Sequence, residues 1–215
     1  RDQVWTPQEI MDVVKAAEEG GTASTGNTIP PRPSIALAIL IAYDTSLPQQ
    51  DILDLTWDQY DGEGLKVIQK KRRGGKKIWV PLSPNSIERI DALDRSSTHI
   101  IISEQDGRPY VDQGDDNRVR CRSFSRIFRK FRDRAGIERH LTFHDIRRTA
   151  LTEFGNSGAT EAEIVSMSGH KMGSQILDVY VKPDTTAGRN AAAKRRTRPV
   201  AGASNKRRTS NKKQQ

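Results

Sequence analysis

Two histidines, one arginine and one tyrosine in the second half of the chain have types and spacings that could act on a phosphodiester. His144 and Arg147 lie three residues apart, which would place both side chains on one face of a helix. His170 follows a Ser-Gly pair, and Tyr180 comes ten residues later. Together they supply two groups that can hold or relay a proton, one permanent cation and one oxygen nucleophile. Such a set could cleave a phosphodiester without a metal.

Each of these residues also has a purely structural explanation. His144 could begin a helix without a chemical task, and Arg147 could be a surface cation like its neighbour Arg148. His170 could simply follow a glycine that ends a helix. Tyr180 lies between two valines and could be a core aromatic residue. Only the combination of the four favours a functional site.

Positive charge is concentrated in two places in the body of the chain. Residues 70–77 hold six cations in eight positions, and residues 118–134 hold eight more. Such basic surfaces suit a nucleic-acid partner, although a charged turn and a solvated helix face would give the same pattern. We favour the nucleic-acid interpretation, and we assign the contact to Lys70, Arg72, Arg73, Lys76, Lys77, Arg122, Arg126 and Arg148.

The net charge of +9 comes from the C-terminal tail. Residues 194–215 contain nine of the 36 basic residues and no acid, whereas residues 1–193 carry 27 basic and 27 acidic side chains. The tail is rich in Ala, Ser, Asn and Gln, and it has too little apolar surface to fold alone, so we expect a disordered basic extension. It could contact a polyanion loosely or act only as a solubilising segment.

Capping and periodicity predict a mainly helical scaffold for these residues. Capping boxes predict helix starts at Thr6 and Thr160, and Thr142 is predicted to cap a third helix with Asp145 at its third position. A nearly all-apolar run over 34–44 predicts a buried central helix. Further helices are predicted over 48–55, from Ser83-Pro84 to about 93, and over 118–135 and 174–181, the last one carrying Tyr180.

A small β-sheet is predicted in the middle of the chain. Residues 65–69 and 77–81 alternate in polarity and flank a Gly-Gly turn, which predicts a hairpin with cations at its tip. Residues 99–102 predict a third strand. The fold class is therefore mainly α with a small antiparallel sheet of three strands, and 20–33 and 103–117 are predicted loops.

The composition excludes several classes of protein. No apolar run approaches the roughly 20 residues that span a bilayer, and no secretory signal is present. Cys121 is the single cysteine, which excludes an internal disulfide framework and a Cys-rich zinc site and fits a reducing compartment. The chain begins at Arg1 instead of methionine, so we interpret it as a piece of a longer or processed protein.

The chain resembles the catalytic domain of the phage integrase family, the tyrosine recombinases, from about residue 5 to residue 183. A histidine-x-x-arginine box, a Leu/Ser-Gly-His box, a nucleophile position, a hairpin lysine and the segment around the family's first arginine carry the resemblance. In this sequence these are His144-Asp145-Ile146-Arg147-Arg148-Thr149, Ser168-Gly169-His170, Tyr180, Lys71, and Thr45-Ser46-Leu47 with residues 51–57. The ordered set is far more specific than a lone histidine-x-x-arginine.

The resemblance implies a role for each of the five catalytic candidates. Tyr180 would attack the DNA phosphorus, leaving a 3′-phosphotyrosyl bond and a free 5′-hydroxyl. His144 would take or relay the phenol proton, and Arg147 and His170 would hold the phosphate oxygens. Lys71 would protonate the leaving oxygen, and Lys70 is the alternative residue for this role. No cofactor and no metal is implied; we assign the other histidines, His99 and His140, to structure.

One position departs from the family pattern. Pro48 stands where the family has its first catalytic arginine, while Asp51 matches the acid that follows. Losing one such donor typically costs on the order of 10²–10³ in rate. Either another cation substitutes, such as Arg72 or Arg73, or the enzyme is slow, or the chain is a DNA-binding remnant that has lost activity.

We therefore interpret residues 1–183 as a recombinase catalytic domain of phage or mobile-element origin. Residues 184–193 would be a segment exchanged between subunits, and 194–215 the tail. The expected partners are double-stranded DNA and three further copies of the chain in a tetramer, without a membrane; the accessory proteins and target site are not predicted. The family's N-terminal DNA-binding domain would lie upstream of Arg1. We expect a bacterial cytoplasmic protein at the nucleoid, or a phage-encoded one. A type IB topoisomerase is ranked last because no bulky linker is visible.

Overall fold

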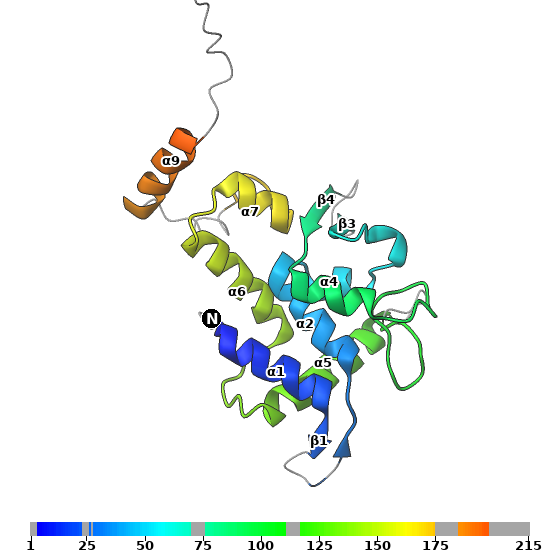
Figure 1. Ribbon diagram of the computed structural model, residues 1–215. Helices are drawn as coiled ribbons and strands as arrows, with labels where there is room; N and C mark the ends of the chain where they lie inside the picture. The colour runs from blue at the N-terminus through cyan, green and yellow to red at the C-terminus, as the bar shows by residue number, and fades with distance from the viewer. Residues whose placement is uncertain are drawn as a thin grey trace, which may run out of the picture. The chain divides into compact units, whose positions relative to one another are not determined.

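The computed structural model describes residues 4–22, 26, 28–69, 76–110, 117–174 and 185–197. The chain divides into two units, Arg1–Val181 and Lys182–Gln215. In the described part of the first unit the elements are, in order, α1 (Pro7–Glu19), β1 (Gly21–Thr22), β2 (Thr28–Ile29), α2 (Pro33–Thr45), α3 (Gln49–Leu53), the 3₁₀ turn η1 (Trp57–Gln59), β3 (Gly64–Gln69), β4 (Lys76–Pro81), α4 (Pro84–Asp91), α5 (Asn117–Arg134), α6 (Phe143–Asn156) and α7 (Glu161–Ser168) (Figure 1). The second unit contains α9 (Thr185–Thr197). None of the helices in these ranges has the length and apolar character needed to cross a bilayer.

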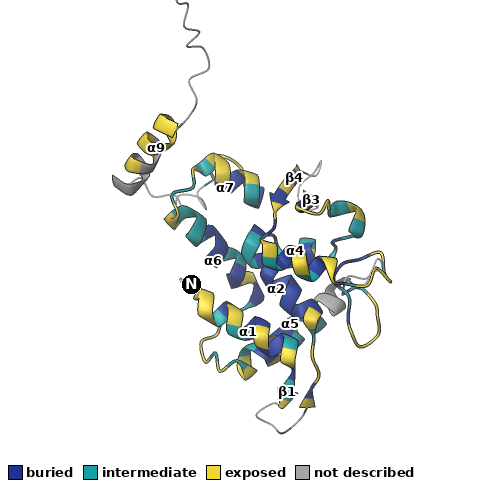
Figure 2. Ribbon diagram, in the orientation of Figure 1, coloured by how far each residue is buried: buried dark blue, intermediate teal, exposed yellow. Residues whose placement is uncertain are grey.

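Helix α2 is the centre of the hydrophobic core. Every residue from Ser34 to Ala42 is buried, and Figure 2 shows this ribbon dark blue over most of its length. Helices α1, α4 and α6 pack against it. A helix that is apolar on all sides must be covered on all sides. The prediction of a buried central helix is therefore confirmed, both in the residues that it spans and in the helices that cover it.

Helix α5 separates an apolar face from a basic face, as predicted. Phe124, Phe128 and Phe131 are buried, and the first two make edge-to-face contacts with Phe143 at the start of α6, with ring centroids 5.1 and 5.4 Å apart. The arginines at 122, 126 and 129 are exposed on the other face. Burial of the aromatic stripe therefore fixes which way the cations of α5 point.

The predicted basic hairpin is present as β3 and β4. Leu65 pairs with Val80 and Val67 pairs with Ile78, and these four side chains face the core. The alternate positions face outward, as the period of two requires. The tip, residues 70–75, lies outside the described residues.

The third predicted strand is not a strand. Residues 99–102 make only isolated bridges, Thr56 to His99 and Ile102 to Pro109, and Ile100 N donates to the Leu55 carbonyl at 2.9 Å. The apolar residues of this segment correctly indicated burial. The segment packs beside the α3–η1 region, however, and does not extend the hairpin. The small second sheet, β1 with β2, lies in a region that we expected to be a loop.

Helices α6 and α7 begin where the sequence predicted. Both start with a capping box, Thr142 with Asp145 and Thr160 with Glu163. The predicted helix over 174–181 falls almost entirely in residues 175–184, outside the described residues. Helix α9 extends to Thr197, so its last turn includes the first positions of the predicted tail.

Candidate active site

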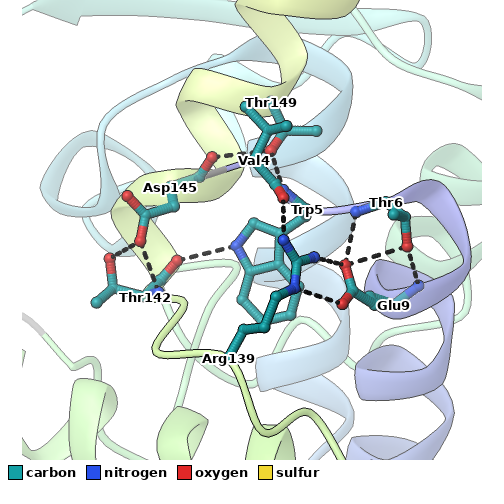
Figure 3. Close-up of polar contacts among 8 residues, drawn as sticks. All are labelled: Val4, Trp5, Thr6, Glu9, Arg139, Thr142, Asp145 and Thr149. Carbon is teal, nitrogen blue, oxygen red and sulfur yellow. Dashed lines mark hydrogen bonds and ion pairs between the residues drawn. The ribbon is translucent and has the colours of Figure 1, made fainter. Parts of the chain in front are cut away.

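The first turns of α6 are fastened to the N-terminal segment of the chain. The Trp5 backbone N–H donates to Thr149 Oγ1 at 2.8 Å, and the Trp5 indole N–H donates to the Thr142 carbonyl at 3.1 Å (Figure 3). Arg139, just before α6, pairs with Glu9 and donates to the Val4 carbonyl at 3.2 Å. The helix that carries His144 and Arg147 is therefore held at both its first and second turns.

The Arg147 guanidinium contacts both the loop after α2 and the end of α7. It donates to the Ser46 carbonyl, and its Nη2 lies 3.3 Å from the Ser168 carbonyl oxygen. The same Nη2 lies 3.2 Å from Nε2 of His170. A guanidinium has five donors in a fixed plane, so contacts to several acceptors fix its orientation. Arg147 and His170, which the sequence analysis assigned to one site, are thus in contact.

His170 is oriented by the end of α7. Gly169 ends this helix in the left-handed conformation, with φ 69°, which turns the chain so that His170 faces back towards the helix. The ring nitrogen Nδ1 lies 2.7 Å from Ser168 Oγ. Ser168 itself is buried, and its hydroxyl donates to the Ile164 carbonyl at 2.6 Å.

The loop between α2 and α3 supplies the carbonyl on the other side of Arg147. Ser46 has φ 54°, the single positive φ of a non-glycine residue within the described ranges. Such a residue ends α2 as a left-handed C-cap, a role usually taken by glycine. Two positions later, Pro48 is the N-cap of α3. Proline offers neither a cation nor an N–H here, and the contact that the structure shows between this loop and Arg147 is made by the Ser46 carbonyl.

His144 lies in a basic hollow beside α5. The hollow has a volume of about 220 Å³, and Gln49, Arg129, Arg132 and His140 also line it. A second hollow of about 320 Å³ shares Gln49, Ser125 and Arg129, and Arg122 and Arg126 complete it. No carboxylate lines either hollow among the residues that the structure describes, so both favour an anion.

A known protein family matches this chain over most of its length. The family model described as "Phage integrase family" matches residues 4–186. The chain belongs to the phage integrase family. Two Haemophilus influenzae proteins, provisionally named integrase/recombinase, are 28% and 27% identical over 168 and 187 residues, covering 78% and 86% of this chain. The chain spans 42% and 54% of their lengths.

Solved structures of this family share the fold. A lambda integrase dimer bound to a COC′ core site superposes with a TM-score of 0.61 and 21% identity, covering 84% of this chain and 48% of that one. The catalytic domain of bacteriophage HP1 integrase gives a TM-score of 0.60 with 16% identity, covering 88% of this chain and 93% of that one. The predicted fold class, a tyrosine recombinase catalytic core, is confirmed.

The remaining integrase candidates fall into two groups. Tyr180, Lys70, Lys71, Arg72 and Arg73 lie outside the described residues. Of the others, Lys76 and Lys77 belong to β4, Arg122 and Arg126 are exposed on α5, and Arg148 is half-buried on α6.

Another cavity lies away from Arg147 and His170. It measures about 680 Å³ and lies between the hairpin and α3, and neither Arg147 nor His170 lines it. His99, which we assigned to structure, lies in its wall, with Nε2 3.9 Å from Asp54 Oδ1.

Four polar residues around the site were not among the predicted site residues. Ser168 contacts both His170 and Arg147, while Gln49, Arg129 and His140 line the hollow beside His144. Ser168 is the first residue of the motif that contains His170, and Gln49 follows Pro48, so these positions were the available signal. Arg129 and His140 carried no signal beyond their charge or type, because only the packing of α5 beside α6 brings them close to His144.

Proposed function

We propose that this chain is the catalytic domain of a site-specific tyrosine recombinase that cleaves and rejoins DNA through a 3′-phosphotyrosyl intermediate. The observation that carries the proposal is the contact between Arg147 and His170, two family motif residues that are 23 positions apart in the chain. Guanidinium and imidazole are both suited to hold phosphate oxygens. Their present partners include neutral carbonyls, and a charged phosphate is a stronger hydrogen-bond acceptor than a carbonyl.

The proposed reaction exchanges one phosphoester for another. Tyr180 Oη attacks the phosphorus and loses its proton to His144, directly or through water, while the bond to the 5′-oxygen breaks. Lys71 protonates that oxygen, and Arg147 and His170 stabilise the charge that builds on the two other oxygens. The phosphotyrosyl bond keeps the energy of the original ester, so a new 5′-hydroxyl can reverse the step without a nucleotide cofactor.

DNA binding by this chain is supported by the basic hollow. Exposed arginines of α5 face the same region as His144, and the lysines of β4 add charge at the hairpin. Among the family's solved structures are a lambda integrase dimer on a core site and a lambda integrase tetramer on a Holliday junction. We propose a homotetramer on DNA for this chain as well, with residues 184–193 exchanged between neighbours.

A suicide substrate tests the proposed activity. The substrate is a duplex nicked beside the cleavage site, so that the short 5′-hydroxyl product diffuses away and the covalent complex accumulates. We expect a protein–DNA adduct on a denaturing gel with the native chain and none with Tyr180→Phe, because phenylalanine has no oxygen nucleophile. Tyr110→Phe is the matched control, since Tyr110 is a buried core tyrosine.

The second candidate function is DNA binding without cleavage. Pro48 favours it, because the loop before α3 presents a carbonyl and no guanidinium beside Arg147. DNA binding without any adduct, over the full range of protein concentrations, would establish the binding module and reject the enzyme. An adduct that survives Tyr180→Phe would reject the nucleophile assignment.

A further inference from the structure

The Ser168 hydroxyl lies between a carbonyl and a ring nitrogen. Its Oγ is 2.6 Å from the Ile164 carbonyl oxygen and 2.7 Å from Nδ1 of His170. The side chain is 1% exposed, so the protein supplies the surroundings of these contacts. A hydroxyl has one proton to donate, and a carbonyl oxygen can only accept. The Ser168 proton therefore points to Ile164.

This placement decides the protonation of the His170 ring. Because the Ser168 hydroxyl donates its proton to the Ile164 carbonyl, its oxygen presents a lone pair to Nδ1 of His170. The close contact between Oγ and Nδ1 is favourable only if Nδ1 carries a proton. In a neutral imidazole Nε2 is then the acceptor. Nη2 of Arg147 lies 3.2 Å from Nε2 and 3.5 Å from Nδ1, so the guanidinium contacts the ring between its two nitrogens. The close partner of Nδ1 is Ser168 Oγ, at 2.7 Å.

The contact with Ser168 thus requires the Nδ1–H tautomer of the neutral ring. We propose that Ser168 is a positioning residue that holds neutral His170 in the Nδ1–H form, in contact with Arg147. Ser168 acts on both partners, because its side chain binds the imidazole and its carbonyl accepts from the guanidinium. A phosphate oxygen can accept from His170 Nε2 once that nitrogen has also taken up a proton, and the Nδ1–H contact with Ser168 is the same in that charged form. Its consequence for cleavage rests on the proposed function, whereas the tautomer itself does not.

Nitrogen-15 NMR of the full chain without DNA tests the tautomer directly. Long-range ¹H–¹⁵N correlations at about pH 8.5, where imidazoles are neutral, distinguish a protonated from an unprotonated ring nitrogen. The chain has four histidines, and the variant His170→Gln identifies the resonances of His170 by their loss. We expect a protonated Nδ1 in the native chain and in Ser168→Thr, and a changed tautomer ratio in Ser168→Ala.

Ser166→Ala is the matched control within the same helix. Its hydroxyl also donates to a carbonyl four residues earlier, that of Ala162 at 2.8 Å, and it is exposed. This variant should leave the His170 spectrum unchanged. A protonated Nε2 in the native chain would overturn the proposal, and so would a Ser168→Ala spectrum identical to the native one. If Ser168→Ala does not fold, the spectra of the native chain and of Ser168→Thr still show whether Nδ1 of His170 is protonated.

The suicide substrate adds a functional readout. We expect Ser168→Ala to form the covalent complex roughly ten- to a hundredfold more slowly at saturating DNA, because a misplaced group affects the chemical step more than binding. Ser168→Thr should restore the rate. Equal rates for Ser168→Ala and the native chain would overturn the positioning role. Failure of the native chain to form any adduct would reject the proposed function while leaving the NMR result intact.

Discussion

At the scale of single residues, charge pairing joins the start of α1 to the segment before α6. The Arg139 guanidinium beside Glu9 holds the pKa of that carboxyl below its usual value, and hydrogen bonds from Thr6 act in the same direction. Glu9 also completes the capping box of α1. One carboxylate thus serves both a helix start and the contact that holds the segment leading into α6.

This pairing predicts a pH-dependent contribution to stability. Because the pKa of Glu9 is lower in the folded chain, its contribution is present above the unfolded value of about 4.3 and disappears as the pH falls through the folded value. Urea unfolding should show the native chain to be more stable than Glu9→Gln at pH 7, with a difference that shrinks below about pH 5. Glutamine keeps the capping pattern, so the difference reports the charge.

Glu19→Gln is the control for this prediction. Glu19 is exposed near the other end of α1 and lies 3.9 Å from Lys15. We expect little effect from this change at any pH, because exposed pairs contribute little. A difference between the native chain and Glu9→Gln that stayed constant from pH 7 to about 3 would contradict the charge explanation.

At the scale of elements, the loop between α2 and α3 determines how the site is completed. The left-handed Ser46 ends α2 and turns its carbonyl to Arg147, and Pro48 begins α3 immediately afterwards. The backbone φ of Pro48 is −63°, which any L-residue adopts without strain. An arginine can therefore replace this proline without changing the path of the chain.

Pro48→Arg should raise the rate of covalent complex formation. A second guanidinium would then start two residues from the carbonyl that Arg147 contacts. We expect a gain of at least about tenfold, since one oxyanion donor is typically worth on the order of 10²–10³ in rate. Single-turnover cleavage of the suicide substrate measures it, with Pro48→Gln as the control that loses the proline ring without gaining a charge.

A rate that does not rise with Pro48→Arg would mean that another cation already serves the phosphate. Arg129 of α5 is one described candidate, because it lines the hollow that contains His144 and Gln49. Arg129→Ala would then slow cleavage in the native chain, and Pro48→Arg would restore the rate. This comparison distinguishes a site that lacks the second cation from one in which another residue supplies it.

At the scale of the whole molecule, charge is distributed in two parts. Residues 1–193 are balanced at 27 cations and 27 acids, and the excess of nine lies in residues 194–215. Residues 1–193 still present a basic face, because the exposed arginines of α5 lie on one side of that helix.

Deletion of residues 194–215 should flatten the salt dependence of DNA binding. For every phosphate that the tail neutralises in the full chain, its deletion should reduce the slope of log K against log salt by about 0.9. Fluorescence anisotropy over a salt series measures the slope. A deletion of 198–215 leaves α9 whole, and a full-length chain with the tail cations changed to glutamine separates charge from length.

An unchanged slope in the glutamine-substituted chain would show that the tail does not touch DNA. The adduct formed on the suicide substrate provides the second readout. We expect it to survive the deletion at low salt, because none of the tail residues belongs to the proposed chemistry.

The sequence alone determined the features that depend on near neighbours. The capping boxes at Thr6, Thr142 and Thr160 predicted helix starts correctly, because their bonds join residues three positions apart. The two-sided pattern of α5 predicted its buried and basic faces, and the motif spacing predicted the family. All of these signals are periodic or contiguous, so they can be read without knowing how the chain folds back.

Tertiary structure alone decided how Arg147 is held. Its acceptors at Ser46 and Ser168 lie 101 and 21 positions away in the chain, and their carbonyls reach it only because α2 packs on α6 and Gly169 turns the chain after α7. The same dependence explains why residues 99–102 are not a strand, since whether a buried segment finds a strand edge depends on its neighbours. A backbone carbonyl has no identity in a sequence, because every residue carries one.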